Sequence, residues 1–86
     1  MKLIFSDRAW EDYLHWQTTD RRMLRRVNEL IRDTARSPFA GIGKPEPLRN
    51  LLAGFWSRRI DGEHRMVYRV TDDGAIHIVQ LRYHYE

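Results

Sequence analysis

Two short segments of the 86-residue chain carry side chains that can move protons. In the first, Glu46 stands between two prolines, which limit where its carboxylate can point because they restrict the backbone on both sides. In the second, His84 lies between two tyrosines, directly after a strand-like run. Each segment also has an ordinary explanation: a solvated glutamate in a stiff loop, and a strand end that uses its tyrosines for burial.

A carboxylate, a guanidinium and an imidazole on one surface are together the parts needed to cleave RNA without a metal ion. The carboxylate takes the proton from the ribose 2′-OH, which attacks the adjacent phosphorus. The guanidinium stabilises the charge that builds up on the phosphorane, and the imidazolium protonates the departing 5′-oxygen. Whether these groups meet in space depends on the fold.

The charge of the chain favours a polyanionic partner. Its 15 Lys and Arg residues outnumber its 12 Asp and Glu residues, and lysine occurs only at Lys2 and Lys44. The other cations are arginines, which bind phosphate through two parallel hydrogen bonds and stack on bases. A small protein with a solvated basic helix face explains the same charge equally well.

Several classes of site are disfavoured by composition. The chain has no cysteine, which removes disulfides, thiol nucleophiles and thiolate zinc sites. Its four histidines show no close ligand spacing, so we expect no metal and no cofactor. One of them, His64, falls in a predicted hairpin and has no evident task. No run approaches roughly 18 apolar residues, and we expect a cytoplasmic protein without membrane contact.

The length predicts a single domain over residues 1–86 with one modest core. Residues 2–5 form a short apolar run that predicts a strand, and Ser6 offers an N-cap for a helix from about Asp7 to Thr18. The apolar positions of that helix predict a buried stripe of Trp10, Tyr13, Leu14 and Gln17. A second helix follows Asp20 and stops at Ser37-Pro38.

The second half of the chain reads as a loop followed by strands. Residues 39–54 have no period and several Gly and Pro residues, which predicts a loop without a regular element. Strand-like runs follow at 55–60, 65–70 and 75–81, separated by turns that contain Asp and Gly. The predicted fold is α+β: strand–helix–helix, then an antiparallel sheet of three or more strands, with both helices packed on one face.

A sheet covered by helices on one face has a second face free for function. Alternation along residues 65–70 places Arg65 and Arg69 on that open face. One arginine of the Arg58-Arg59 pair joins them in either register. These arginines predict a cradle for phosphate groups.

Six segments of the chain, in register, together form a recognisable pattern. They are Met1–Ser6, Asp12–Leu14 with Trp16-Gln17, Lys44–Leu48, Gly54–Ile60, Glu63–Tyr68 and Arg82–Tyr85. With them the chain resembles, over essentially its whole length, the YoeB-like toxins of bacterial type II toxin–antitoxin pairs, in the RelE-like family of mRNA interferases. The resemblance implies the RelE-like, microbial ribonuclease-like version of the predicted fold.

The resemblance also implies an activity, namely an endoribonuclease that enters the ribosomal A site, cuts mRNA there and stops translation. It places the general base on Glu46, the transition-state arginine on Arg65 and the general acid on His84, with Tyr85 beside it. The residues that it implies for holding RNA are Arg59, Arg49 and Lys44. Strict alternation would put His84 and Tyr85 on opposite faces, so the chain must leave strand geometry after about Leu81 if both serve the site.

The partners that the resemblance implies are mRNA on the ribosome and a cognate, YefM-like antitoxin that keeps the toxin inactive. Operator DNA is contacted only through the toxin–antitoxin complex, and a homodimer is left open. The chain departs from the family's common loop sequence at Asn50–Ala53.

Two other functions compete with the enzyme. One is a non-catalytic basic module that binds RNA or the ribosome and blocks translation by occupancy. The other is a protein-interaction module whose open sheet face accepts a segment of a partner. A pure binder would tolerate Glu46→Gln and His84→Gln, whereas the enzyme would not.

Overall fold

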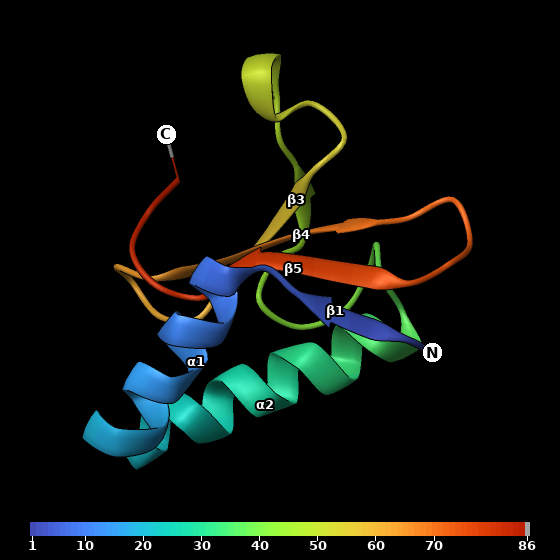
Figure 1. The fold of residues 1–86 in the computed structure, drawn as a ribbon. Helices are drawn as coiled ribbons and strands as arrows, with labels where there is room; N and C mark the ends of the chain where they lie inside the picture. Colours follow the sequence, from blue (N-terminus) through green and yellow to red (C-terminus); the bar gives the residue numbers. More distant parts are fainter. Residues whose placement is uncertain (86) are drawn as a thin grey trace.

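Two helices lie against one face of a five-stranded sheet (Figure 1). The computed structural model describes residues 1–85, so Glu86, the last residue of the predicted domain, lies outside the described residues. The elements are β1 (Leu3–Phe5), α1 (Asp7–Thr19), α2 (Arg21–Arg36), β2 (Glu46–Pro47), the 3₁₀ helix η1 (Asn50–Leu52), β3 (Trp56–Arg59), β4 (Arg65–Val70) and β5 (Ile76–Gln80). The predicted α+β fold, with both helices on one face, is confirmed.

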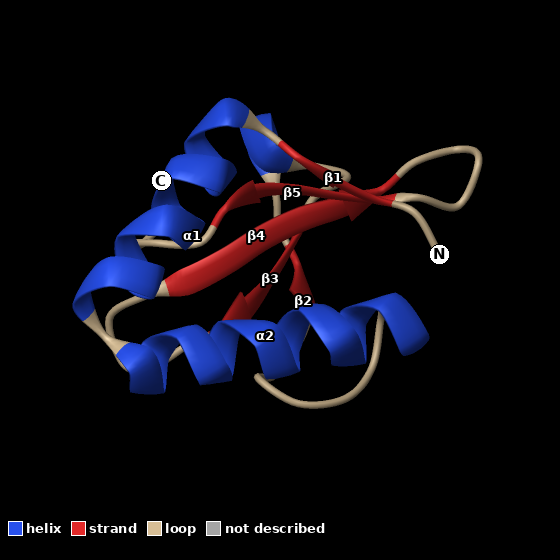
Figure 2. Cartoon of the chain, turned by 60° about the horizontal axis from the view of Figure 1, so that its bottom comes forward, coloured by secondary structure: helices blue, strands red, loops and turns tan. Residues whose placement is uncertain are grey.

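The strand order is β1-β5-β4-β3-β2, and the sheet is mixed rather than wholly antiparallel. Strands β2 to β5 pair antiparallel, but β1 pairs parallel with β5. The parallel pair is available to β1 because its connection to the rest of the sheet runs through two helices instead of a tight hairpin. Figure 2 shows β1 and β5 side by side, with α2 below the strands in that view.

The prediction that residues 39–54 contain no regular element is wrong at two places. Glu46 and Pro47 pair with Ser57 and Trp56 as the edge strand β2, and residues 50–52 form η1. A proline is tolerated in an edge strand because its missing N–H is not needed by a further neighbour. This short strand, invisible to periodicity, joins Glu46 to the sheet.

The buried face of α1 differs from the predicted aromatic stripe. Ala9, Asp12 and Trp16 are the buried residues of this helix, whereas Trp10 is 48% exposed. Trp10 instead stacks on Tyr13 at the rim of the core, with 5.8 Å between ring centroids. The helix turns this way because Asp12 and Trp16 hydrogen-bond the chain beyond β5, a demand that apolar spacing does not reveal.

The core contains a fully buried arginine. Arg58 has no exposed surface, and its Nη1 lies 2.6 Å from Asp33 Oδ2 on α2. Its Nε also donates to the hydroxyl of Tyr68, a group that burial keeps protonated by raising its pKa. The guanidinium further donates to the backbone carbonyls of Ser37, Ala40 and Ile42. A buried charge is tolerated only with such complete pairing.

The buried position of Arg58 settles which arginine of the pair faces outward. Arg59 is exposed and lies opposite Arg65 in the β3–β4 register, on the face away from the helices. The carbonyls that Arg58 binds also fix the path from the end of α2 toward β2. Gly41, at φ +120°, passes so close to Asp33 that a Cβ there would collide with the carboxylate.

We expect the Asp33–Arg58 pair to make stability sensitive to acid. Hydrogen bonds from Arg36, the Ile42 amide and Arg58 lower the pKa of Asp33 from 3.8 to about 2. A carboxyl with a lowered folded pKa contributes stability above its unfolded pKa, and the contribution is lost as pH falls through the folded value. The free energy of unfolding should therefore fall between pH about 4 and about 2.

Asp33→Asn should be less stable at neutral pH and show a shallower fall over that acid range, because it cannot supply the carboxylate. Urea unfolding at a series of pH values measures both effects. Asp72→Asn, in an exposed turn, is the matched control and should follow the wild type. Parallel curves for Asp33→Asn and the wild type would contradict the prediction.

Candidate active site

The face of the sheet opposite the helices carries Glu46. In the strand register Glu46 lies opposite Ser57, and Ser57 lies opposite Val67. Residues directly opposite one another in a sheet share a face, and this row alternates with the core residue Arg58. The Glu46 side chain is therefore exposed on the open face.

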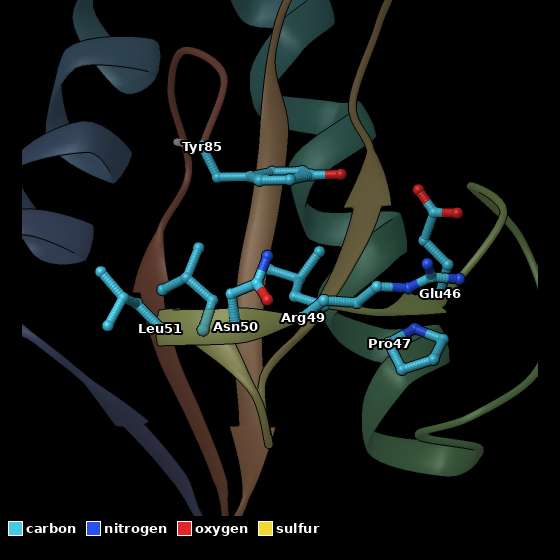
Figure 3. A pocket seen from close by; sticks show the side chains of 8 residues that line it. Glu46, Pro47, Arg49, Asn50, Leu51 and Tyr85 are labelled. Carbon is cyan, nitrogen blue, oxygen red and sulfur yellow. The ribbon is translucent and has the colours of Figure 1, made fainter.

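Two adjoining hollows lie on this face. The first has a volume of about 590 Å³ and is lined by Glu46, Arg49 and Tyr85, among others. Figure 3 shows Tyr85 on one side of it, and Glu46 and Arg49 on the other. The second, of about 650 Å³, is lined by His84 and shares Leu52 and Tyr85 with the first. We call the two together the site hollow.

The chain leaves the sheet after Gln80 and bends over the open face as a terminal hook, residues 81–85 (Figure 1). The departure agrees with the expected break after about Leu81. Tyr83 has φ +66°, in the left-handed region, and this turn carries His84 and Tyr85 toward the site hollow. Both side chains thereby reach one surface, as an extended strand would not allow.

Side chains from α1 hold the start of the hook. Asp12 Oδ2 accepts the Leu81 N–H at 3.0 Å, and Trp16 Nε1 donates to the Leu81 carbonyl at 2.8 Å. Asp12 and Trp16 are one helical turn apart, so their side chains reach the same stretch of chain. Both lie in segments that carried the resemblance, but their task was not predicted.

Residues near the β3–β4 turn hold the middle of the hook. His64 Nδ1 accepts the Tyr83 N–H at 2.7 Å, and the Arg65 N–H donates to the Tyr83 carbonyl at 3.0 Å. The Gln80 amide lies 2.8 to 3.1 Å from the carbonyls of residues 82, 83 and 84. The interpretation of His64 as a histidine without a task is wrong, because a buried ring nitrogen bonds a residue far along the chain.

Only some of the predicted site residues line the site hollow. Glu46, Arg49, His84 and Tyr85 line the site hollow. Arg59, Arg65 and Lys44 lie outside the two sets of lining residues. Arg65 is half-buried, and its Nη1 donates to the carbonyls of Asp61 at 2.7 Å and His64 at 3.1 Å. These two bonds hold one side of the guanidinium close to the turn.

The described residues offer no other obvious chemistry. Among residues 1–85 no group of three or more His, Cys, Asp or Glu side chains could hold a metal ion. Neither helix in this part of the chain has the length and apolar character needed to cross a membrane. The residues at hand can transfer protons and bind anions.

Comparison with known proteins identifies the family. A family model described as the YoeB-like toxin of bacterial type II toxin–antitoxin systems matches residues 5–85. The chain belongs to this family. Among curated relatives, the toxin YoeB of Escherichia coli strain K12 is 61% identical over 85 residues, which make up 99% of this chain and 100% of the relative. The resemblance inferred from the six sequence segments is thereby confirmed.

Solved structures of YoeB-like toxins share the fold. A YoeB/ParE toxin from Agrobacterium tumefaciens superimposes with a TM-score of 0.95 at 52% identity, covering 99% of this chain and 100% of the other. The YoeB of Staphylococcus aureus is solved as a dimer and in a heterotetrameric YoeB–YefM complex. Each gives a TM-score of 0.89 at 44% identity and covers 99% of this chain and 98% of the other.

We expect the backbone that leads into β2 to be sensitive at Gly43. Gly43 has φ +79°, and an added Cβ would lie 2.8 Å from Leu30 Cδ2 and 3.1 Å from the Arg59 carbonyl. Gly43→Ala should therefore lose about 1–2 kcal/mol of stability through the left-handed backbone and about 1–3 kcal/mol more through the clash.

Gly54→Ala is the matched control, since Gly54 has φ +95° and no atom within 4 Å of the added Cβ. It should show only the backbone loss of about 1–2 kcal/mol. Urea unfolding of both variants gives the two free energies. Equal losses would show that close packing at Gly43 is unimportant.

Proposed function

We propose that this YoeB-like toxin is an endoribonuclease that cuts mRNA in the ribosomal A site and thereby stops translation. The observation that carries the proposal is that Glu46 and His84 line adjoining hollows on one face and share Tyr85 between them. One can serve as a base and the other as an acid, on opposite sides of a bound phosphodiester.

In the proposed reaction Glu46 accepts the proton of a ribose 2′-OH, whose oxygen then attacks the adjacent phosphorus. His84 donates a proton to the departing 5′-oxygen as the P–O bond to it breaks. The products are a 2′,3′-cyclic phosphate and a free 5′-hydroxyl. Protons and charge balance between the two side chains, so the step needs no cofactor and no oxidant.

Arg65 is the proposed partner of the charge that builds up on the phosphorane. Its backbone N–H bonds the Tyr83 carbonyl of the terminal hook, so the start of β4, which carries Arg65, is joined to the segment that carries His84. Tyr85, between the two hollows, can pack against a base or the ribose. Arg49, Arg59 and Lys44, all exposed, are the proposed contacts to the RNA backbone.

The shape of the site supports a dependence on the ribosome. The site hollow is an open surface formed by an edge strand and the terminal hook, and a flexible RNA can cross it in many orientations. Aligning the 2′-oxygen, phosphorus and 5′-oxygen requires the substrate to be held in place. We propose that the ribosome supplies this alignment by presenting mRNA in a fixed path.

We expect Glu46→Gln and His84→Gln each to lower the rate of mRNA cleavage on programmed ribosomes by about 10²- to 10⁴-fold, because each removes one proton transfer. The assay maps the cut and its 2′,3′-cyclic end at matched occupancy of the ribosome. Glu29→Gln and His77→Gln replace the same residue types outside the site hollow and should cut at the wild-type rate.

The alternative function makes the opposite prediction in the same assay. A basic module that blocks translation by occupancy would arrest ribosomes without a cut, and Glu46→Gln and His84→Gln would arrest them equally well. That outcome would remove the catalytic assignments.

The proposed protein partner is a YefM-like antitoxin. The YoeB of Staphylococcus aureus has been solved with YefM and also as a dimer. We propose that an acidic, initially disordered segment of the antitoxin covers the open face around Arg59 and Arg65 and blocks it by charge neutralisation. A homodimer, and operator DNA contact through the toxin–antitoxin complex alone, belong to the same proposal.

We expect Arg59 and Arg65 to lose solvent access when the antitoxin binds, because carboxylates would occupy their guanidinium groups. Phenylglyoxal modification followed by mass spectrometry measures this residue by residue. Labelling of Arg59 should fall several-fold in the complex, while Arg32 on α2 serves as an exposed control. Undiminished labelling of both Arg59 and Arg65 would contradict the proposed mode of inhibition.

A further inference from the structure

We infer that His64 and Asp12 are positioning residues for the cleavage reaction, because their side chains fix the terminal hook in the geometry that brings both His84 and Tyr85 to the site hollow. This inference rests on the proposed function. Neither side chain lines the site hollow. Both act on backbone groups of the hook, at Tyr83 and Leu81 respectively.

The hook needs such anchors because it has left the ladder of the sheet. Backbone N–H and C=O groups that lie away from water must find partners elsewhere. Asp12 and Trp16 bind the N–H and the carbonyl of Leu81, and His64 and the Arg65 N–H bind those of Tyr83. Leu81 and Tyr83 are thus each held at both of their backbone groups.

The side chains that anchor Leu81 and Tyr83 pack together as one buried group. His64 is 9% exposed, and Asp12 and Trp16 are 8% and 6% exposed. The Trp16 ring lies edge-on to the His64 ring, with 4.9 Å between centroids, and the His64 ring in turn lies 5.7 Å from the Tyr83 ring. The packing fixes the direction in which His64 Nδ1 points, so the nitrogen meets the Tyr83 N–H.

The conformation of Tyr83 shows what the anchors oppose. Its φ of +66° is disfavoured for a residue with a side chain, and such a conformation persists only where the surroundings impose it. Without the bond to His64, the backbone at Tyr83 can return to the extended region. His84 and Tyr85 would then point to opposite faces of the chain, and they could no longer both line the site hollow.

Small displacements of a catalytic group can lower the reaction rate strongly. A displacement of about 1 Å in a reacting group can lower a rate by about 10²-fold, even when the altered residue lies away from the chemistry. RNA binding should change less, because the basic residues proposed to hold the RNA backbone, Arg59, Arg49 and Lys44, lie outside the hook. Because Tyr85 is the one proposed RNA contact within the hook, loss of an anchor should lower kcat by a larger factor than it raises KM.

The test compares His64→Leu with His64→Asn. Leucine fills the space but accepts no hydrogen bond, whereas the Asn carbonyl oxygen can occupy the position of Nδ1. On programmed ribosomes, His64→Leu should lower kcat at least about 10-fold, within the range expected for a misplaced acid, and His64→Asn should recover most of the loss. His77→Leu, in β5 and outside the site hollow, should leave kcat unchanged.

Hydrogen exchange of the Tyr83 amide gives a readout that does not depend on activity. Exchange should be slow in the wild type and in His64→Asn, and fast in His64→Leu. A second pair, Asp12→Leu and Asp12→Asn, tests the same idea at the Leu81 amide if His64→Leu fails to fold, because Asn also keeps an acceptor.

The outcomes separate this inference from the proposed function. If the wild type does not cut mRNA, the proposed function fails and the positioning role falls with it. If the wild type cuts and His64→Leu cuts at the same rate, the function stands and the positioning role alone is overturned. An equal loss in His64→Leu and His64→Asn, with unchanged amide exchange in both, would also overturn it.

Discussion

The buried guanidinium of Arg58 determines the path of the chain from α2 to the edge strand β2. Arg58 is fully buried, and a buried guanidinium must be paired at nearly every N–H, since removing a partner from such a group typically costs about 3–5 kcal/mol. Its partners lie on α2, on β4 and along the loop that follows α2. Satisfying that one side chain therefore fixes the loop, and the loop sets where the edge strand with Glu46 meets the sheet.

The terminal hook, in contrast, is held by hydrogen bonds from side chains to its backbone groups. Asp12 and Trp16 project from α1 beyond the end of β5, and His64 projects from the β3–β4 turn. The helical layer thus has two tasks, because it buries the core and also holds a segment that lies beyond the sheet. The edge strand and the terminal hook both border the site hollow, and Tyr85 lines both of its parts.

The regular elements could be predicted from the sequence because their signals are local. The strand and helix boundaries near Phe5, Ser6 and Asp20 depend on period and capping, which a few neighbouring residues determine. The choice between Arg58 and Arg59 could not be predicted, because alternation gives the parity of a strand and not its register. The edge strand β2 was also missed, since two residues are too few to show a period.

The site was harder to predict for a physical reason. Its residue types came from the sequence and their roles from the resemblance, and those roles remain predictions. What brings His84 and Tyr85 to one face is a left-handed residue and a set of bonds to side chains far away along the chain. No local pattern encodes such contacts, so the task of His64 emerged only from the fold.

The distant anchors have a consequence for folding. The bonds from α1 to Leu81 join residues 65 and 69 positions apart, and Ser6 reaches Val79 across 73 positions. Contacts between residues far apart in the sequence close large loops. They tend to form late, because the chain loses loop-closure entropy before the contact can offset that loss. We therefore expect helices and hairpins to assemble first and the terminal hook last. A partly folded chain would then hold much of its core while lacking an assembled site, so that toxicity would report completed folding.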